Sequence, residues 1–417
     1  MKRILAVAVF SVLLLSMPVF AQKTTVTVWF AGTPQGFMDV INNELVPEFE
    51  AANPNIDLTV SFVPWGELST KLATAFAGGV APDVFMHGGA ATAGFAASGR
   101  LEPLDSYLAG WPDAADFGAT LDSGLYKGKR YLVPMFGAGR LLVYRADFFR
   151  EAGLDPAKPP TTWEELRAAA SALAVKKDGR LVREGLDLPI SGIDAQQIWA
   201  GLLWQNGGDF FNEDFTKAVF NSPEGVAALE FLVGFIHKDG VTDTRYDVGQ
   251  STAPPPMALG KTAMFFAVPE ELNQIKTYSP DVYKEVRVAL PLKRKAQVTL
   301  YSFSGLFLSK DSKHKAQAWE AIKFFGSKSS LAKINASMGT LPPRKSLATA
   351  DFIAHDPNIK AFVEGMQYGK PNPNIPTWVK CRDALSRYIE KAIFGQLSPK
   401  EALDQAAAEV DKILAQQ

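Results

Sequence analysis

The apolar positions of this chain follow two different periods, and these periods alternate over the first hundred residues. Segments rich in β-branched and aromatic residues are separated by stretches in which apolar residues recur as on one face of a helix. In chain order the predicted segments are Thr24–Phe30 (strand), Phe37–Ala52 (helix), Ile56–Pro64 (strand), Glu67–Phe76 (helix) and Asp83–Met86 (strand). This order is typical of an α/β fold.

The third predicted strand stops at His87, Gly88 and Gly89. Glycine has no Cβ, so it leaves backbone N–H groups open to an approaching ligand and tolerates positive φ. In open parallel sheets, ligands bind outside the carboxyl ends of the strands. The pattern therefore predicts a binding cleft at this end of the sheet.

The same alternation continues further along the chain. Short strands are predicted at Tyr131–Val133 and Leu141–Tyr144, on both sides of the glycine-rich segment Phe136–Gly139. Thr162 precedes a pair of glutamates with the spacing of a capping box, and Ser222 precedes a proline that opens an apolar helical run. We predict helices that begin after Thr162 and after Ser222, within an α/β architecture.

The first 21 residues have the composition of an export signal. Lys2 and Arg3 precede an apolar run, Ile4–Val19, and a small-residue pattern that ends at Ala21 offers a cleavage point. The alternative is a membrane anchor, but the run is short for the ~20 residues that cross a bilayer. No cysteine lies near the cleavage point to carry a lipid. We expect cleavage after Ala21 and a soluble, periplasmic product.

Composition narrows the class of partner. Lys plus Arg number 43 and Asp plus Glu number 44, a balance that gives no strong field for nucleic acid or for an anionic membrane. Hydrophobic residues make up 47% of the chain, enough for large cores, and the length allows two or three domains. Cys381 is the only cysteine, so an intrachain disulfide is excluded. We expect a monomer with a small or neutral partner.

Catalytic and metal-binding motifs are missing from the sequence. It has no nucleophile elbow, no phosphate-binding loop and no HExxH pair, and Gly137–Gly139 lacks the third glycine of a dinucleotide loop. We therefore expect neither a cofactor nor a metal. The histidines, which lack the spacing of metal ligands, are His87, His237, His314 and His355.

Five blocks of the sequence together resemble a known family. They are FEAANPNIDLTVSFVPWGELSTKLATAFAGGVAPDV, YLVPMFGAGRLLVYRADFFREAGLDPAKPPTTWEEL, GKTAMFF, GTLPPRKS and FGQLSPKEALDQA. In this order, over nearly the whole mature chain, they are similar to the extracellular solute-binding proteins of ABC importers, in the group that resembles maltose-binding protein. The resemblance implies two α/β lobes joined by three crossing segments, with a ligand held in the cleft between the lobes.

The resemblance also implies a function without catalysis. We expect the protein to capture a sugar, either a mono- or an oligosaccharide, and to deliver it to the membrane permease subunits of an ABC importer. One alternative is a binding protein for a polyol or a glycerol phosphate-like solute. The other is an exported glycoside hydrolase, which would need two carboxylates facing one cleft.

By the same resemblance, each lobe is built from two separate stretches of chain. The first lobe is expected to hold residues 22–137 and 263–325, and the second lobe residues 138–262 and 326–417. The crossings are then expected near Phe136–Arg140, Gly260–Met264 and Phe324–Ser327. Such crossings would act as a hinge around a cleft that buries most of a small ligand.

Candidate ligand residues come from the segments that the resemblance brings to this cleft. Aromatic rings cover the C–H faces of a sugar, while amide, hydroxyl, imidazole and charged groups bond its hydroxyls. The candidates at strand ends and crossings are Trp65, His87, Gly88, Phe136, Gly137, Glu270, Tyr301 and Ser302. Those at helix starts are Gln197 with its neighbour Gln196, Trp199, Trp378 and Arg382.

Several of these residues also have a structural interpretation. Trp65 and His87 are compatible with packing at a strand end, and Phe136–Gly137 with packing at a hinge. Glu270 is compatible with a solvated helix start. Arg344, after two prolines, is expected to be structural.

The helix that starts at Trp378 carries the sharpest expectation. Trp378 and Arg382 stand four residues apart and share one helix face. We expect Trp378 to cover a sugar ring and to contribute little to either core. Trp204 stands five residues after Trp199 and is expected to point into a core. Arg382, with Arg344 or Arg140 nearby, keeps an anionic ligand as an alternative to a neutral one.

Overall fold

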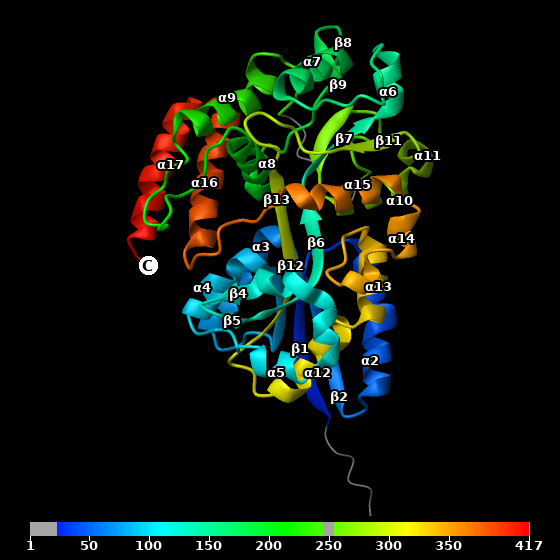
Figure 1. The fold of residues 1–417 in the computed structure, drawn as a ribbon, viewed down its shortest axis with the longest axis vertical. Coiled ribbons are helices and arrows are strands. Elements are labelled where there is room, and N and C mark those ends of the chain that lie inside the picture. Colours follow the sequence, from blue (N-terminus) through cyan, green and yellow to red (C-terminus); the bar gives the residue numbers. More distant parts are fainter. Residues whose placement is uncertain (1–22, 245–253, 417) are drawn as a thin grey trace, which may run out of the picture.

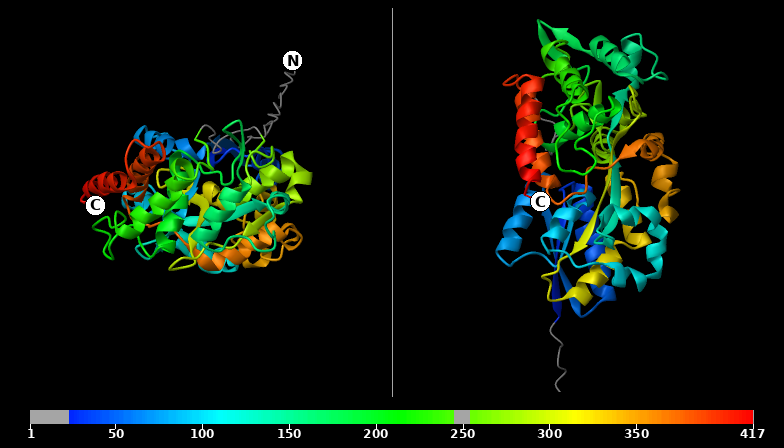
Figure 2. Two further views of the ribbon diagram at one scale, coloured as in Figure 1. Left: turned by 90° about the horizontal axis from the view of Figure 1, so that it is seen from above. Right: turned by 60° about the vertical axis from the view of Figure 1, so that its left-hand side comes forward.

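A computed structural model describes residues 23–244 and 254–416 of the chain. It shows an elongated molecule made of two halves, which lie one above the other in Figure 1 and in the right-hand view of Figure 2. Two strands, β6 (Leu132–Gly139) and β12 (Thr299–Leu308), run between the halves. The expected export signal, residues 1–21, lies outside the described residues. In the described part, no helix has the length and apolar content that a bilayer crossing requires.

The largest sheet has six strands, which are β1 (Thr24–Ala31), β2 (Ile56–Val63), β3 (Val84–Gly88), β6, β12 and β13 (Gly369–Lys370). Its order is β13-β12-β3-β1-β2, and β6 also pairs with β12. β1 is parallel to β2 and to β3, whereas β12 is antiparallel to β3 and to β6. Because β1, β2 and β3 are parallel, their carboxyl ends meet at one edge of the sheet.

A second sheet lies in the other half of the molecule. Its strands are β10 (Met264–Ala267), β7 (Leu141–Arg145) and β11 (Val286–Ala289), all antiparallel to their neighbours in that order. The remaining strands of the described residues form two short hairpins. One pairs β4 (Leu125–Tyr126) with β5 (Lys129–Arg130), and the other pairs β8 (Val175–Lys177) with β9 (Arg180–Arg183).

Helices surround both sheets. In the first 210 residues they are α1 (Gln35–Asp39), α2 (Val46–Ala52), α3 (Trp65–Ala77), α4 (Thr92–Ala97), α5 (Asp105–Ala109), α6 (Ala146–Glu151), α7 (Trp163–Leu173) and α8 (Gly192–Gln205). Further along they are α9 (Pro223–His237), α10 (Pro269–Tyr278), α11 (Pro280–Tyr283), α12 (Lys315–Phe325), α13 (Lys328–Met338), α14 (Asp351–Ala354), α15 (Pro357–Gly365), α16 (Trp378–Ile393) and α17 (Pro399–Leu414). Short 3₁₀ segments cover Gly89–Ala91, Pro112–Gly124, Lys345–Leu347 and Met366–Tyr368.

Local sequence signals explain where several helices begin. The Thr162 hydroxyl accepts a hydrogen bond from the Glu165 N–H at 3.2 Å, and the Ser222 hydroxyl accepts from the Gly225 N–H at 3.4 Å. These caps satisfy N–H groups that have no partner inside the helix, so both predicted starts are confirmed. The helix predicted over Phe37–Ala52 is instead interrupted by a π-helical turn between α1 and α2.

Apolar side chains form three clusters. The first core joins β1, β2, β3, the first half of β6 and the end of β12 to α12 and α13. The second core is largely helical and joins α7, α8, α9, α16 and α17. The third core joins β7, β10 and β11 to α10 and α15. We call the elements of the first core the first lobe, and those of the second and third cores the second lobe.

Two stretches lie in a different lobe from the one expected. β10 was expected in the first lobe but pairs with β7, and Leu272 of α10 packs in the third core. α13 was expected in the second lobe, but Leu331 packs in the first core. Strand pairing and core packing decide these placements, and the pattern of residues along the chain does not predict either of them. The other lobe boundaries stay a prediction.

The chain therefore crosses between the lobes at positions that differ in part from the expected ones. β6 leads into β7 at Arg140, within the expected stretch. The next crossing is β12, which leaves Leu300 in the second core and Leu306 in the first. The last lies between Leu347 of the first core and Ile353 of the third. Within residues 254–416, no crossing occurs near 260–264 or 324–327.

Candidate functional site

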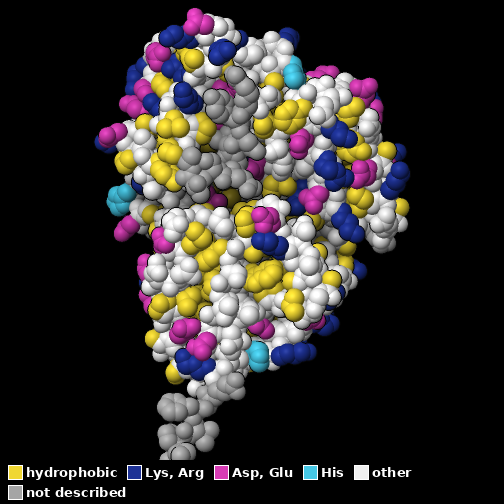
Figure 3. Space-filling model, turned by 180° about the vertical axis from the view of Figure 1, so that it is seen from behind, with side chains coloured by type: hydrophobic (Ala, Val, Ile, Leu, Met, Phe, Trp, Pro, Cys, Tyr) yellow, Lys and Arg dark blue, Asp and Glu magenta, His cyan; other side chains and the backbone are white. Residues whose placement is uncertain are grey.

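Three helix starts of the second lobe lie at the junction with the first lobe. α16 packs against the 3₁₀ turn that follows β3, α10 packs against α13, and α8 packs against the crossing strand β12. The carboxyl ends of β1, β2 and β3 face the same junction. The molecular surface narrows between the two halves (Figure 3). The candidate site is therefore the region between these strand ends and helix starts.

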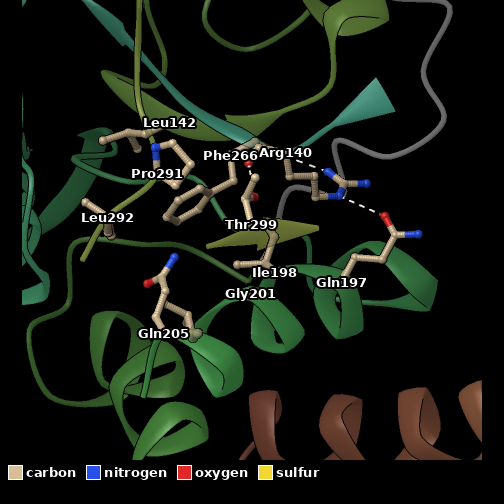
Figure 4. A pocket seen from close by; sticks show the side chains of 11 residues that line it. Arg140, Leu142, Gln197, Ile198, Gly201, Gln205, Phe266, Pro291, Leu292 and Thr299 are labelled. Atoms are coloured by element: carbon tan, nitrogen blue, oxygen red, sulfur yellow. Dashed lines mark hydrogen bonds between the residues drawn. The ribbon is translucent and has the colours of Figure 1, made fainter. Parts of the chain in front are cut away.

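A buried guanidinium lies at the crossing from β6 to β7. Arg140, 8% exposed, donates from Nε to the side-chain oxygen of Gln197 at 2.9 Å and from Nη2 to Asp194 Oδ1. Its Nη1 also donates to the Phe266 carbonyl at 3.4 Å. Both side-chain partners lie in the first turns of α8, so Arg140 ties the start of this helix to the hinge. Figure 4 shows the hydrogen bond to Gln197.

A small pocket opens beside this arginine, inside the second lobe. α8 forms one wall, β7 and β10 form the other, and the Arg140–Gln197 pair lies at one end (Figure 4). Its lining is mostly apolar, so it offers little to a polar solute by itself. The lining residues are Arg140, Leu142, Gln197, Ile198, Gly201, Leu202, Gln205, Phe266, Pro291, Leu292 and Thr299.

Two neighbouring carboxyl groups at the start of α10 have raised pKa values. Burial raises the pKa of Glu270 from 4.5 to about 7, and the charges of Glu271 and Asp194 add to the rise while Arg140 opposes it. Burial likewise raises the pKa of Glu271 to about 7. Glu271 accepts a hydrogen bond from the Val268 N–H at 2.8 Å as part of the helix cap. Within the described residues Glu270 makes no such bond, so its carboxyl group is the one left for a ligand.

The first-lobe candidates Trp65, His87 and Gly88 lie together at the ends of β2 and β3. The Trp65 indole is half-buried and meets the imidazole of His87 edge to face, with 6.3 Å between ring centroids. The Gly88 N–H donates to His87 Nδ1 at 2.8 Å, which leaves the proton on Nε2, 3.2 Å from the Ser69 hydroxyl. Both imidazole nitrogens are thus occupied within the protein, which favours the structural role of His87.

The electrostatics of His87 connect the two lobes. Its pKa is lowered to about 3, chiefly by burial and to a smaller extent by the positive charge of Arg382. The start of α16 therefore lies near the end of β3. Arg382 is itself paired with Asp383 on the same helix at 2.7 Å. His87 is neutral at neutral pH and contributes no charge to a ligand.

The hinge candidates pack against the protein rather than against open space. Phe136 is 3% exposed and lies in the first core. A Cβ atom added to Gly137 would lie 2.7 Å from the hydroxyl oxygen of Tyr301, so glycine is required where this ring crosses β6. The Tyr301 hydroxyl is buried without a hydrogen-bond partner among the described residues. Ser302 is half-buried opposite Ala138 in the paired strand.

The expectation of two cleft tryptophans in the second lobe is wrong. Trp199 is fully buried and its indole N–H donates to the Gly225 carbonyl at 3.2 Å. Trp378 is 1% exposed, and its ring centroid lies 5.0 Å from that of Phe210. Both belong to the second core, because the packed helices need large apolar side chains to fill the space between them. Trp204 lies in the same core, as expected.

Gln196 is a polar candidate of the second lobe, next to Gln197 in the chain. Its side chain is fully buried, and neither its amide nitrogen nor its amide oxygen has a hydrogen-bond partner among the described residues. Buried polar groups are nearly always paired, so this amide calls for a partner such as a ligand or a water molecule. The sequence signal was an amide pair at a helix start, and it did not distinguish the two members. Asp194 was not anticipated at all.

The described residues contain no group of three or more His, Cys, Asp or Glu side chains placed to hold a metal ion. The junction instead combines amides, carboxyl groups, a paired guanidinium and aromatic rings. Such groups can bond hydroxyls and cover apolar faces of a small molecule held between the lobes.

Comparison with known proteins decides the family. A family model described as bacterial extracellular solute-binding protein matches residues 32–331, which is most of the chain. The chain belongs to this family. Its members bind solutes outside the cytoplasm, and the two-lobed α/β fold with crossing strands is the architecture seen in this chain.

Relatives match over nearly their full length. The diacetylchitobiose binding protein DasA of Streptomyces coelicolor is 26% identical over 94% of this chain and 90% of its own. The sn-glycerol-3-phosphate-binding periplasmic protein UgpB of Escherichia coli is 24% identical over 94% of this chain and 92% of its own. An ABC transporter solute binding protein from Thermotoga lettingae, solved with α-D-tagatose, is 26% identical, has a TM-score of 0.84 and covers 94% of this chain and 100% of its own.

Truncation of Trp378 is expected to destabilise the fold. Trp378→Ala removes an indole from the second core and leaves a cavity, so the free energy of unfolding should fall by about 3 to 5 kcal/mol. Urea denaturation measures this loss. Trp65→Ala, which truncates a half-buried indole, should cost clearly less. Equal losses for the two variants would contradict the core assignment of Trp378.

The carboxyl group of Glu270 should make stability depend on pH. Its pKa is about 7 in the folded protein and 4.5 in the unfolded chain, so the folded state keeps the proton bound up to a higher pH than the unfolded state does. Its contribution therefore destabilises the protein as pH rises from about 4.5 through 7. Glu270→Gln should raise the free energy of unfolding by on the order of 2 kcal/mol at pH 8 and leave it unchanged at pH 4. Glu213→Gln, at an exposed acid, serves as the control and should show no such pH-dependent gain.

Proposed function

We propose that the protein captures a neutral sugar, a mono- or oligosaccharide, in the periplasm and delivers it to the permease subunits of an ABC importer. The observation that carries the proposal is the similarity, over almost the whole length, to solute-binding proteins whose names include sugar ligands. The export signal expected in residues 1–21, with cleavage after Ala21, is consistent with this location.

The pairing of the arginines favours a neutral ligand over an anionic one. Arg140 is bonded to Asp194 and Gln197, and Arg382 is paired with Asp383. Arg344 lies away from the junction, where it donates to the Gly326 carbonyl and pairs with Asp116 at 3.2 Å. A phosphate group would need a cation that is not already neutralised. The glycerol phosphate-like solute remains the second candidate because of the Escherichia coli relative.

The carboxyl groups at the junction support binding rather than hydrolysis. Glycoside hydrolysis uses two carboxyl groups on opposite sides of the scissile bond. Asp194 is bonded to Arg140, and Glu271 caps α10. Neither is therefore available as the second catalytic carboxyl group beside Glu270. A lone half-buried carboxyl group is suited to accept or donate a hydrogen bond to a sugar hydroxyl.

A ligand screen tests the proposal directly. Thermal shift and calorimetry should be run with tagatose, maltotriose, diacetylchitobiose and sn-glycerol-3-phosphate. At least one neutral sugar should raise the melting temperature, and chromatography should recover it unchanged. Stabilisation by glycerol phosphate alone would favour the second candidate, and cleavage of a sugar would favour the hydrolase.

Replacement of Gln196 should separate ligand binding from stability. Gln196→Leu removes a buried amide that has no partner, so the ligand-free protein should be at least as stable as the parent. The same change removes a donor and an acceptor for hydroxyls, so affinity for the sugar found in the screen should fall about tenfold. Calorimetry and urea denaturation measure the two effects.

Gln205 on the same helix provides the matched control. Its side chain accepts from the Trp163 indole N–H at 2.7 Å and donates to the Val298 carbonyl at 3.0 Å. Gln205→Leu should therefore lower stability and leave the affinity of the folded protein unchanged. If Gln196→Leu instead behaves like Gln205→Leu, Gln196 is a structural residue and does not contact the ligand.

A further inference from the structure

An asparagine of the second lobe caps a helix of the first lobe. The side-chain oxygen of Asn374 accepts a hydrogen bond from the Ala93 N–H at 3.0 Å, and its nitrogen donates to the Leu125 carbonyl at 2.8 Å. Ala93 is the second residue of α4, where helix N–H groups lack partners within the helix. Ile375, the next residue, packs in the second core. The cap therefore joins the two lobes.

A second asparagine makes the equivalent bond at the end of another helix. Asn273 of α10 donates from its side-chain nitrogen to the Ser337 carbonyl at 2.6 Å. Ser337 is the last residue but one of α13, where carbonyl groups lack partners within the helix. Leu272, beside Asn273, packs in the third core, whereas α13 packs in the first. This bond also joins the two lobes.

The two contacts lie on opposite flanks of the crossing strands. In Figure 1, α4 lies to one side of β6 and β12, and α10 and α13 lie to the other. The backbone bonds between Gly137 and Leu341 lie at the hinge itself. Rocking of one lobe about the crossing strands, in either sense, therefore separates at least one asparagine from its helix end.

We propose that Asn273 and Asn374 form a cross-lobe clasp, which holds the lobes in the arrangement of this structure. Each hydrogen bond is small against the free energy of unfolding, but two such bonds are comparable to the difference between two lobe arrangements. Loss of the clasp should therefore shift the population toward open lobes while both cores stay folded. The proposal concerns the ligand-free protein and does not depend on which solute it binds.

Small-angle scattering of the ligand-free protein tests the clasp. The double variant Asn273→Ala, Asn374→Ala should have a larger radius of gyration than the parent. Asn221→Ala is the matched control, because the Asn221 amide donates to Asp404 at 2.9 Å within the second lobe. The control should scatter like the parent. A double variant that scatters like Asn221→Ala would overturn the proposal, whatever the outcome of the sugar screen.

Hydrogen exchange of α4 supplies a second measurement on the single variants. Asn374→Ala removes the cap of the Ala93 N–H directly and speeds its exchange even if the cap is only local. Asn273→Ala acts on the opposite flank and touches no residue of α4 directly. If the clasp controls the lobe arrangement, Asn273→Ala should also speed exchange in α4, and Asn221→Ala should not. Unchanged exchange in α4 of Asn273→Ala would show two independent local caps and no clasp.

Discussion

The burial of one guanidinium at the hinge organises the junction between the lobes. Arg140 follows the crossing strand β6, and a charge buried there must be fully bonded. Asp194 and Gln197 supply these bonds from the start of α8, and the backbone N–H of Arg140 donates to the Leu300 carbonyl of β12. One residue thus joins two crossing strands to a helix that faces the candidate site. Separation of the start of α8 from the hinge would remove both side-chain partners of this buried charge.

The requirement to satisfy this charge also shapes what the junction can bind. Asp194 is bonded to the guanidinium of Arg140, whose charge also acts on Glu270 and Glu271, and burial raises the pKa of both glutamates. The carboxyl groups exceed the available cations, so the junction is unfavourable for a phosphate or a carboxylate ligand. Hydroxyl groups carry no charge and can both donate and accept, which makes a sugar the better match.

Aromatic residues divide between stability and recognition according to the packing around them. Trp199 and Trp378 fill the helical second core, although both stand near helix starts that point toward the first lobe. Trp65 remains half-buried at the end of β2, in contact with His87. Of the three tryptophans expected in the cleft, Trp65 of the first lobe is therefore the one whose indole is not fully buried. This division follows from which helices pack together.

The sequence by itself determined the features that depend on neighbours along the chain. Alternating periods predicted β1, β2, β3 and α3 of the first lobe, the Thr162 and Ser222 caps predicted two helix starts, and ordered motifs identified the family. Only the tertiary structure decided that β10 pairs with β7, that Trp378 is a core residue and that the Gln196 amide is buried without a partner. These outcomes depend on contacts between residues far apart in the chain. Local pattern carries no record of such contacts, because strand partners and buried faces are selected by packing.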